Sequence, residues 1–382
     1  MRCTPEAVQT ALQKIDARHL RRQREPALDH CVNFCSNDYL NLSTHPQIGA
    51  AMAECALLTG VGAGASHLVS GHGIEHEALE CELAIFTKRE RTLVFSSGYM
   101  ANLGVIGALA QRNDLILEDR LNHASLIDAG LLARTRNFER YPHGDHAVAG
   151  AKLSTHLLAH PASSALLITD AVFSMDGDIA PLAALATHAL AHQAWLIVDD
   201  AHGFGVLGKN GGGCCELLGL NSREVPVLIG TLGKAFGTFG AFVAGDADLI
   251  ELLMQRARSY IYTTALPPPV AAATRVALRL IQEEPQRRFH LHDLIDTFKI
   301  GAARRGLPLM ESNTAIQPII LGSSQKAVQA SARLRDAGYR VAAIRPPTVP
   351  QDSARLRVTL SAGHTHKQVE GLLNALVVTL GM

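Results

Sequence analysis

A lysine surrounded by small residues is the first candidate for chemistry in this sequence. Lys234 stands between Gly233 and Gly237, shortly after the apolar run 225–229. A free lysine has a pKa near ~10.4 and is protonated at neutral pH. Burial in an apolar cleft, or a neighbouring cation, lowers that pKa and frees the amine for Schiff-base chemistry. A solvated loop lysine beside turn glycines is the commoner meaning of such a stretch, so Lys234 alone does not decide the function.

Two aspartates and a histidine follow another apolar run upstream of this lysine. Residues 195–198 lead directly into Asp199 and Asp200, and His202 comes two residues later. This pattern is typical of a buried parallel strand that ends at a ligand site. An aspartate there can hold a protonated ring nitrogen, and His202 can approach the same flat ring. A metal site is the alternative, but no second His/Asp/Glu pair with ligand spacing lies nearby, and no metal is expected.

Together these stretches resemble the pyridoxal 5′-phosphate (PLP) enzymes of fold type I, and more narrowly the α-oxoamine synthase family. The resemblance covers nearly the whole chain in the family's order. Its motifs stand at residues 36–40 (Ser-Asn-Asp-Tyr-Leu), 97–99 with Asn102, 122–125 (Asn-His-Ala-Ser), 172–177 (Val-Phe-Ser-Met-Asp-Gly), 198–202 (Val-Asp-Asp-Ala-His) and 231–234 (Thr-Leu-Gly-Lys). A set of motifs in this order is far more specific than any one of them.

The order of apolar runs predicts an α/β fold. From residue 91 onward, strand and helix patterns alternate, which indicates a mainly parallel sheet covered by helices. The resemblance makes this a seven-stranded sheet of fold type I. We expect an N-terminal helical segment over residues 1–45, with a helix from Pro5 to about Arg24. A large PLP-binding α/β domain over 46–284, a charged hinge at 283–288 and a smaller C-terminal α+β domain over 285–382 complete the prediction.

The resemblance assigns the cofactor, PLP, to residues of several motifs. It makes Lys234, Asp199 and His123 catalytic: the lysine holds PLP, the aspartate holds the ring nitrogen and His123 stacks on the ring. It places His202 and Ser174 near the ring's 3-oxygen. Asp200 is the alternative to Asp199.

The phosphate of the cofactor needs donors of another kind. Gly98 and Tyr99 fall between a strand and a helix, where unpaired backbone amides bind phosphate. The hydroxyl of Thr231 can donate to the same phosphate. By resemblance, Thr263 and Thr264 reach the phosphate from the other subunit of a homodimer with shared active sites.

The substrates are also implied by resemblance. The branch that matches best condenses L-alanine with a pimeloyl thioester, carried by CoA or a carrier protein, in biotin synthesis. Arg21, His123, Thr348 and Arg357 are the expected substrate contacts. A planar guanidinium can grip an amino-acid carboxylate at two points, and the resemblance favours Arg357 over Arg355 for this role. Glycine with an acetyl or succinyl thioester is the alternative within the family.

The composition excludes several other classes of protein. Lys and Arg total 35 and Asp and Glu total 35, so there is no basic excess for nucleic acid or an anionic membrane. No apolar run approaches the ~20 residues of a membrane span, and seven cysteines without a regular framework predict a cytoplasmic protein. A nicotinamide-dependent dehydrogenase would need a strand–GxGxxG–helix start, which is missing. A binding module without activity would not need the Lys/Asp/His set.

Overall fold

The computed structural model describes residues 4–22, 24 and 30–382, which form two compact units. The large unit comprises Leu40–Phe173 and Ile179–Arg288. The small unit comprises the chain up to Tyr39, the short segment Ser174–Asp178 and Phe289–Met382. The three-part division at residues 45 and 284 remains a prediction.

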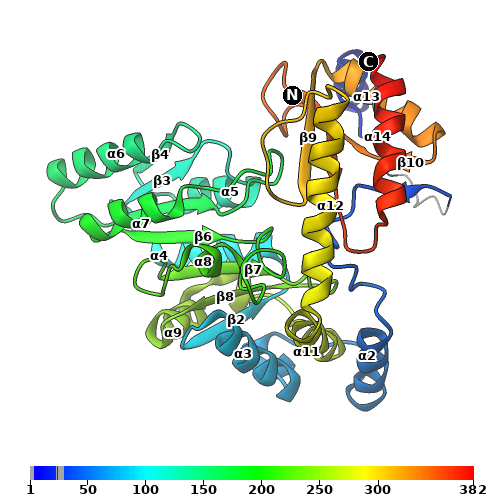
Figure 1. Cartoon of the computed structure of the whole chain (residues 1–382). Coiled ribbons are helices and arrows are strands. Elements are labelled where there is room, and N and C mark those ends of the chain that lie inside the picture. The colour runs from blue at the N-terminus through cyan, green and yellow to red at the C-terminus, as the bar shows by residue number, and fades with distance from the viewer. Residues whose placement is uncertain (1–3, 23, 25–29) are drawn as a thin grey trace. The chain divides into compact units, whose positions relative to one another are not determined.

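A seven-stranded sheet forms the centre of the large unit (Figure 1). In spatial order its strands are β2 (Arg91–Phe95), β8 (Ala241–Gly245), β7 (Val227–Thr231), β6 (Trp195–Asp199), β5 (Ala165–Asp170), β3 (Leu115–Asp119) and β4 (Asn137–Tyr141). Strand β8 runs antiparallel to both β2 and β7, and the remaining neighbours are parallel. The predicted mainly parallel, seven-stranded sheet is confirmed.

Strand β4 is the one strand of this sheet that the sequence pattern does not single out. It lies at the sheet edge, and only Tyr141 of its five residues is buried. Every residue of β3 and β5 is buried, by contrast. An edge strand with a polar sequence carries neither the apolar run nor the clean alternation that identifies buried strands.

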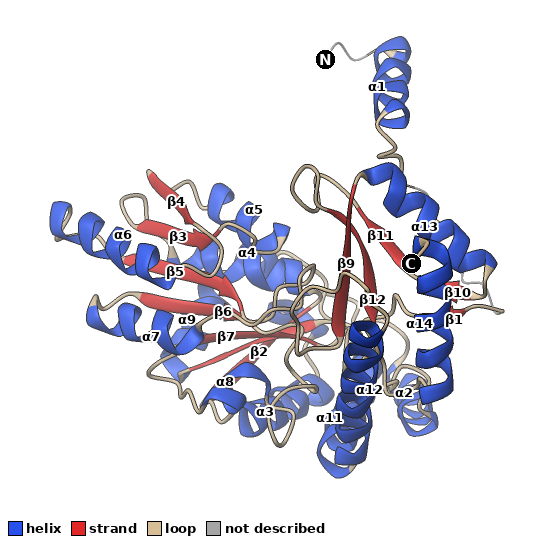
Figure 2. Ribbon diagram, turned by 45° about the horizontal axis from the view of Figure 1, so that its top comes forward, coloured by secondary structure: helices blue, strands red, loops and turns tan. Residues whose placement is uncertain are grey.

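Helices cover both sides of the sheet (Figures 1 and 2). They are α2 (Pro46–Thr59), α3 (Ile74–Thr87), α4 (Gly98–Leu109), α5 (Ala124–Leu132), α6 (His146–Ala159), α7 (Leu182–Ala191), α8 (Gly213–Leu218), α9 (Ala247–Arg256), α10 (Arg258–Ile261) and α11 (Pro268–Glu283), with the short π-helix η1 (His67–Gly71). One face of the sheet packs on α4, α5, α9 and α10 through a core that includes Val105, Leu126, Leu253 and Tyr260. This core holds the strand ends, and with them the site residues, in fixed positions.

The small unit is built around a three-stranded antiparallel sheet. Its strands lie in the order β11 (Ala342–Ile344), β12 (Ala354–Thr359) and β9 (Ile316–Gly322), and β1 (Val32–Asn33) pairs in parallel with β10 (Tyr339–Arg340). The helices of this part of the chain are α1 (Pro5–Ala17), α12 (Pro285–Arg304), α13 (Ser324–Asp336) and α14 (His366–Leu380). The predicted α+β composition of the C-terminal region is confirmed.

One predicted feature is wrong, and another stays a prediction. In the charged stretch 283–288, α11 ends at Glu283 and α12 begins at Pro285, and its role as a hinge stays a prediction. Proline suits the first turn of a helix, where its missing N–H is not needed. The N-terminal helix stops at Ala17 rather than near Arg24, because His19 has a φ of 55° and takes a left-handed conformation.

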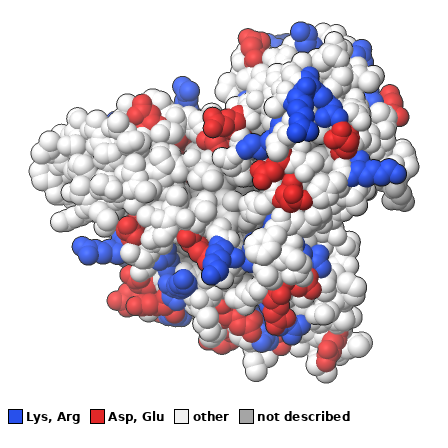
Figure 3. Space-filling view, in the orientation of Figure 1, with Lys and Arg blue, Asp and Glu red and all other residues white. Residues whose placement is uncertain are grey.

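The surface carries acidic and basic side chains interspersed on the face shown in Figure 3. This agrees with a formal net charge of zero over the whole sequence. Among the helices of the described residues, none combines the length and the apolar character needed to cross a bilayer.

Candidate active site

The loop after β7 places Lys234 next to His202. The lysine is half-buried, and its Nζ atom lies 2.8 Å from Nε2 of His202. Gly237 closes the loop with a φ of 67°, and its amide donates to the carbonyl of Lys234. A Cβ atom at this position would lie 2.3 Å from the backbone nitrogen of Ser43. The glycine is therefore required both by its conformation and by its neighbour.

Asp199, the last residue of β6, is fixed by hydrogen bonds on both carboxylate oxygens. Asn102 Nδ2 donates to Oδ2 at 2.8 Å, and the amide of Ala201 donates to Oδ1 at 3.0 Å. The same Asn102 nitrogen donates to Ser125 Oγ, which lies 2.7 Å from His123 Nδ1. A polar network thus links Asp199 to His123 through one amide and one hydroxyl.

Asp200 lies in a different environment from Asp199. It is fully buried, and its Oδ2 accepts from the amide of Cys214 at 2.6 Å. Gly203 and Gly213 leave room for it, since a Cβ on either would lie 2.1 Å from a carboxylate oxygen. Burial raises the pKa of Asp200 to about 7. These contacts give Asp200 a structural role and leave Asp199 as the carboxylate connected to His123.

His123 caps α5, and its residue is exposed to solvent. Desolvation lowers the pKa of its imidazole, Asp199 partly offsets this effect and Lys234 adds to the lowering. The backbone amide of His123 donates to Asp170 Oδ2 at 2.5 Å. Burial and the neighbouring Asp199 carboxylate raise the pKa of Asp170 well above its ordinary value. The lowered pKa of His123 favours its neutral imidazole, which can accept a proton.

The residues predicted to bind phosphate surround the start of α4. This helix begins at Gly98, so the amides of Gly98 and Tyr99 lie in its first turn. Ser97 caps the helix, and the hydroxyl of Thr231 donates to the carbonyl of Gly240 at 3.1 Å.

Tyr99 and Thr264, two of the predicted phosphate-binding residues, have hydrogen-bond partners within the chain. The Tyr99 hydroxyl donates to the carboxylate of Asp128. Thr263 and Thr264 follow α10, and the carbonyl of Thr264 accepts from Ser96 Oγ of the same chain at 3.3 Å. Their reach to another subunit remains a prediction.

Arg357 and Ser174 come together in the small unit. Arg357 is 5% exposed; its Nε donates to the carbonyl of Ser174 at 2.6 Å, and its Nη1 donates to Asn37 Oδ1 at 3.1 Å. Neither partner is a carboxylate, whereas Arg355 forms an ion pair with Asp176. The charge of Arg355 is already balanced, so Arg357 is the better candidate for a substrate carboxylate.

Arg21 and Thr348 also belong to the small unit, but the structure does not join them directly. Arg22 Nη2 donates to Thr348 Oγ1 at 3.0 Å, while Arg21 pairs with Asp16 at 2.8 Å. Arg345 donates to the backbone carbonyls of His19 and Arg21 and so ties the end of the N-terminal segment to the 345–348 turn.

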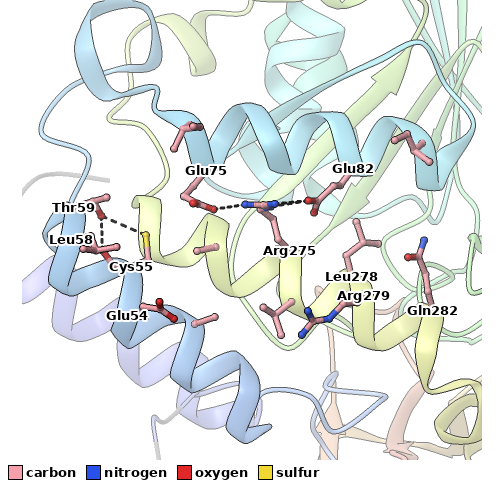
Figure 4. Close-up of a pocket in the computed structure, with 15 residues that line it drawn as sticks. Glu54, Cys55, Leu58, Thr59, Glu75, Glu82, Arg275, Leu278, Arg279 and Gln282 are labelled. Atoms are coloured by element: carbon pink, nitrogen blue, oxygen red, sulfur yellow. Dashed lines mark hydrogen bonds and ion pairs between the residues drawn. The ribbon is translucent and has the colours of Figure 1, made fainter.

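A cavity of about 650 Å³ in the large unit lies among α2, α3 and α11 (Figure 4). None of its lining residues is a predicted site residue. Figure 4 shows Arg275 between Glu75 and Glu82, with ion-pair distances of 2.7 Å to each. The guanidinium charge is balanced there, so this cavity is not a candidate for the cofactor or for an anionic substrate.

Comparison with known proteins identifies the family. The aminotransferase class I and II family matches residues 29–376. The 8-amino-7-oxononanoate synthase of Methylococcus capsulatus is 57% identical over 345 residues, which are 90% of this chain and 88% of that protein. The chain belongs to the 8-amino-7-oxononanoate synthase family, within the class I and II aminotransferases.

Two solved structures support the same assignment. The structure of 8-amino-7-oxononanoate synthase from Francisella tularensis has a TM-score of 0.79 at 31% identity, and the match covers 93% of this chain and 99% of that one. Serine palmitoyltransferase from S. paucimobilis, solved with a PLP adduct bound, has a TM-score of 0.90 at 27% identity over 98% of this chain and 96% of that one. The predicted fold-type I transferase and its PLP cofactor are confirmed.

The residues of this 8-amino-7-oxononanoate synthase family member fit the cofactor. The aldehyde requires an amine, the protonated ring nitrogen a hydrogen-bond acceptor and the phosphate N–H donors. Lys234, the fixed carboxylate of Asp199 and the helix-terminal amide of Gly98 are groups of these three kinds.

Sequence reasoning assigned no role to Asn102, Ser125 or Asp170. Asn102 and Ser125 were recognised only as parts of motifs, although Asn102 is 1% exposed and joins Asp199 to Ser125. Buried polar residues are hydrogen-bonded as a rule, so a polar residue inside an apolar helix pattern is the signal that points to such a partner. Asp170 ends β5 as Asp199 ends β6, and the parallel register places the two side by side.

Proposed function

We propose that this protein condenses L-alanine with a pimeloyl thioester, releasing carbon dioxide and the free thiol and forming 8-amino-7-oxononanoate in biotin biosynthesis. The observation that carries this proposal is the pairing of Lys234 with His202 at 2.8 Å beside the Asp199 network, in a chain of the 8-amino-7-oxononanoate synthase family. The relatives' names supply the product, and the substrates follow from its chemistry.

The roles of the large-unit residues follow from their contacts. When bound, PLP supplies an aldehyde that joins an amine and a protonated ring that accepts electrons. Lys234 would bond the aldehyde, and Asp199 would keep the proton on the ring nitrogen. Thr231 and the amides of Gly98 and Tyr99 would hold the phosphate. His202 orients Nζ of Lys234, to which it is hydrogen-bonded.

Proton transfer is assigned to two groups of the chain. Nζ of Lys234 takes the α-proton of alanine once its amine is released, because it is the base held in place by His202. His123 would pack against the ring face, and its lowered pKa favours the neutral imidazole. It would have to take up a proton before returning one to the product carbon, a step that Lys234 would share once it has taken the α-proton.

Substrate binding is assigned to residues of the small unit. Arg357 binds the α-carboxylate of alanine through N–H donors that its bonds to Ser174 and Asn37 do not use. Ser174 contributes near the ring's 3-oxygen, as the resemblance implies. Arg21 and Thr348 contact the acyl donor, whose far carboxylate suits a guanidinium.

A homodimer is the proposed assembly. The large unit exposes Leu57 by 89%, Leu58 by 82%, Val61 by 83% and Ile74 by 81%. Leaving several large apolar side chains in water is costly, and such groups mark interaction surfaces. A second copy of the chain is the proposed occupant, with Thr263 and Thr264 contributing across the interface. Light scattering after gel filtration should give a dimer, and Leu58→Glu with Ile74→Glu should shift it toward the monomer.

The cytoplasm is the proposed location. All six cysteines of the described residues are free, as expected in a reducing compartment.

Specificity constants for pimeloyl, succinyl and acetyl thioesters, each with alanine and with glycine, test the proposed reaction. Burial of about five methylenes, at ~0.8 kcal/mol each, favours pimeloyl over acetyl by up to about 4 kcal/mol. The methyl group of alanine is worth about 1–3 kcal/mol over glycine in a fitted pocket. Pimeloyl thioester with alanine should therefore react best, with the product identified by mass spectrometry. Glycine with acetyl-CoA as the preferred pair would instead indicate a 2-amino-3-ketobutyrate-forming enzyme.

A further inference from the structure

Three side chains that can bind a metal meet near the start of helices α12 and α14. His290 and Asp293 lie one turn apart on α12, and His366 is the first residue of α14. A ring nitrogen of each histidine and a carboxylate oxygen of Asp293 lie within 4.8 Å of one another. Because 73 residues separate Asp293 from His366, spacing in the sequence does not reveal this group. None of the three residues is assigned to PLP or to a substrate.

Packing between α12 and α14 brings the three residues together. The two helices lie side by side in the small unit (Figures 1 and 2). Gly301 of α12 packs closely on α14, since a Cβ atom there would lie 2.4 Å from Cδ1 of Leu373. Beyond it, Arg305 Nη2 donates to Asn374 Oδ1 at 2.9 Å. Residues three apart share one face of a helix, so His290 and Asp293 both reach the first turn of α14.

Hydrogen bonds outside the group hold two of its members in place. His290 Nε2 donates to the backbone carbonyl of His364 at 2.8 Å, so the lone pair of its neutral ring is on Nδ1. Histidines that bind metals almost always donate their other ring N–H in this way. Thr365 and Gln368 cap α14 through reciprocal hydrogen bonds, which fix the backbone that carries His366.

An ion pair alone does not explain the whole group. His366 Nε2 lies 2.6 Å from Asp293 Oδ2, but the two side chains are 55% and 62% exposed, so their pairing contributes little to stability. It also gives no part to His290, whose ring lies edge-on to that of His366 with the ring centroids 5.7 Å apart. Exposed side chains can rotate until their ligand atoms are roughly 3.3 Å apart, as two ligands of a tetrahedral zinc ion are.

We propose that His290, Asp293 and His366 bind a zinc ion that joins the start of α12 to the start of α14. Zinc takes imidazole nitrogens and carboxylate oxygens, and three protein ligands with one water complete its tetrahedral shell. Magnesium and calcium prefer oxygen ligands, so a group with two imidazoles selects against them. This site goes beyond the proposed reaction and does not depend on it.

Direct binding tests the site without any turnover. Zinc chloride is titrated into the holoenzyme by calorimetry, and Asp293→Asn and His366→Gln should each weaken binding by at least about tenfold. Asp296→Asn is the matched control, since Asp296 is an exposed acid one turn further along α12 and outside the group; it should bind zinc as wild type does. Equal zinc affinity in wild type and both ligand variants would overturn the proposal, and so would equal affinity of wild type for magnesium.

A second group of side chains provides a test of where zinc binds. His72, Glu77 and Glu80 of the large unit also offer three ligand atoms, although the Glu80 carboxylate already accepts from the amide of Val94 at 2.8 Å. His72→Gln should therefore leave the zinc affinity unchanged. If the affinity fell in His72→Gln and not in His366→Gln, zinc would lie in the large unit and the proposed site would be wrong.

Thermal stability gives an independent measurement. A zinc ion that binds the folded chain raises its thermal midpoint, so zinc should raise the midpoint of wild type and Asp296→Asn but not that of Asp293→Asn. His366→Cys keeps a zinc ligand and should recover part of the affinity that His366→Gln loses. An equal rise of the midpoint in Asp293→Asn and wild type, or no recovery in a folded His366→Cys protein, would contradict binding by these side chains.

Discussion

Nζ of Lys234 and Nε2 of His202 are 2.8 Å apart, although 32 residues separate them in the chain. The contact exists because β6 and β7 are parallel neighbours, so the loops that follow them emerge at the same edge of the sheet. His202 fixes the position of an amine that would otherwise move through four rotatable bonds. A fixed amine has less conformational entropy to lose when it reacts.

Replacing Lys234 with alanine should abolish turnover and remove the visible absorbance that arises when the cofactor is bonded to the enzyme. Lys209→Ala, a lysine on an exposed loop, should change neither property. Borohydride reduction followed by peptide mapping provides the measurement. It should place the pyridoxyl group on Lys234 of wild type, and recovery of the label on another lysine would refute the assignment.

Asp199→Asn should leave the protein folded but slow exchange of the alanine α-proton by about 100-fold or more, because the ring loses the carboxylate that keeps its nitrogen protonated. The rate is measured by NMR in deuterated solvent. Asp200→Asn is the matched control: Asp200 binds the Cys214 amide and has a pKa near 7, so its neutral form is already populated. If the α-proton exchanged faster in Asp199→Asn than in Asp200→Asn, Asp200 would be the residue that holds the ring nitrogen and Asp199 would have the structural role.

The sequence predicted the site residues that follow recognisable strands, but not the side-chain contacts between separate elements. Lys234, Asp199 and His202 follow recognisable strands, so their arrival at one sheet edge was predictable. The link from Asp199 through Asn102 to Ser125 was not, because it joins β6 to α4 and α5 through side chains whose directions depend on packing. The same limit explains why β4 was not predicted. It is a strand because it pairs with β3, and its polar sequence alone does not indicate a strand.

The predicted end of the N-terminal helix is wrong because the backbone conformation of a single residue determines it. The N-terminal helix has arginines and apolar residues at helical spacing beyond Ala17, yet it ends there because His19 adopts a positive φ. Hydrophobic periodicity does not specify the backbone conformation of a single residue.

Arg357→Lys should raise KM for the amino acid by about tenfold while KM for the acyl thioester stays unchanged, because lysine cannot present two parallel N–H donors to a carboxylate. Initial rates with each substrate varied in turn measure this. Arg355→Lys is the comparison: Arg355 is paired with Asp176, so this change should lower the thermal midpoint and leave KM for the amino acid near wild type. An increase in KM for the amino acid in Arg355→Lys alone would reverse the assignment.

Glu118 should make the protein less stable as the pH rises. The side chain is fully buried in β3, and neither carboxylate oxygen has a hydrogen-bond partner among the described residues. Burial raises its pKa from 4.5 to about 8, with Arg140 acting in the opposite direction. Between these two values the unfolded chain loses a proton that the folded chain keeps, so the free energy of unfolding falls with rising pH over this window.

Glu118→Gln should therefore flatten the pH dependence of stability between about pH 5 and pH 8, because an amide does not ionise. One pKa unit corresponds to about 1.4 kcal/mol, so the difference between variant and wild type over this window should reach a few kcal/mol at most. Urea midpoints at pH 5, 6.5 and 8 measure it. Glu139→Gln in the neighbouring β4, where Glu139 is partly exposed and paired with Lys152, should follow the wild-type curve. Parallel curves for Glu118→Gln and wild type would show that Glu118 ionises in the folded protein much as it does in the unfolded chain.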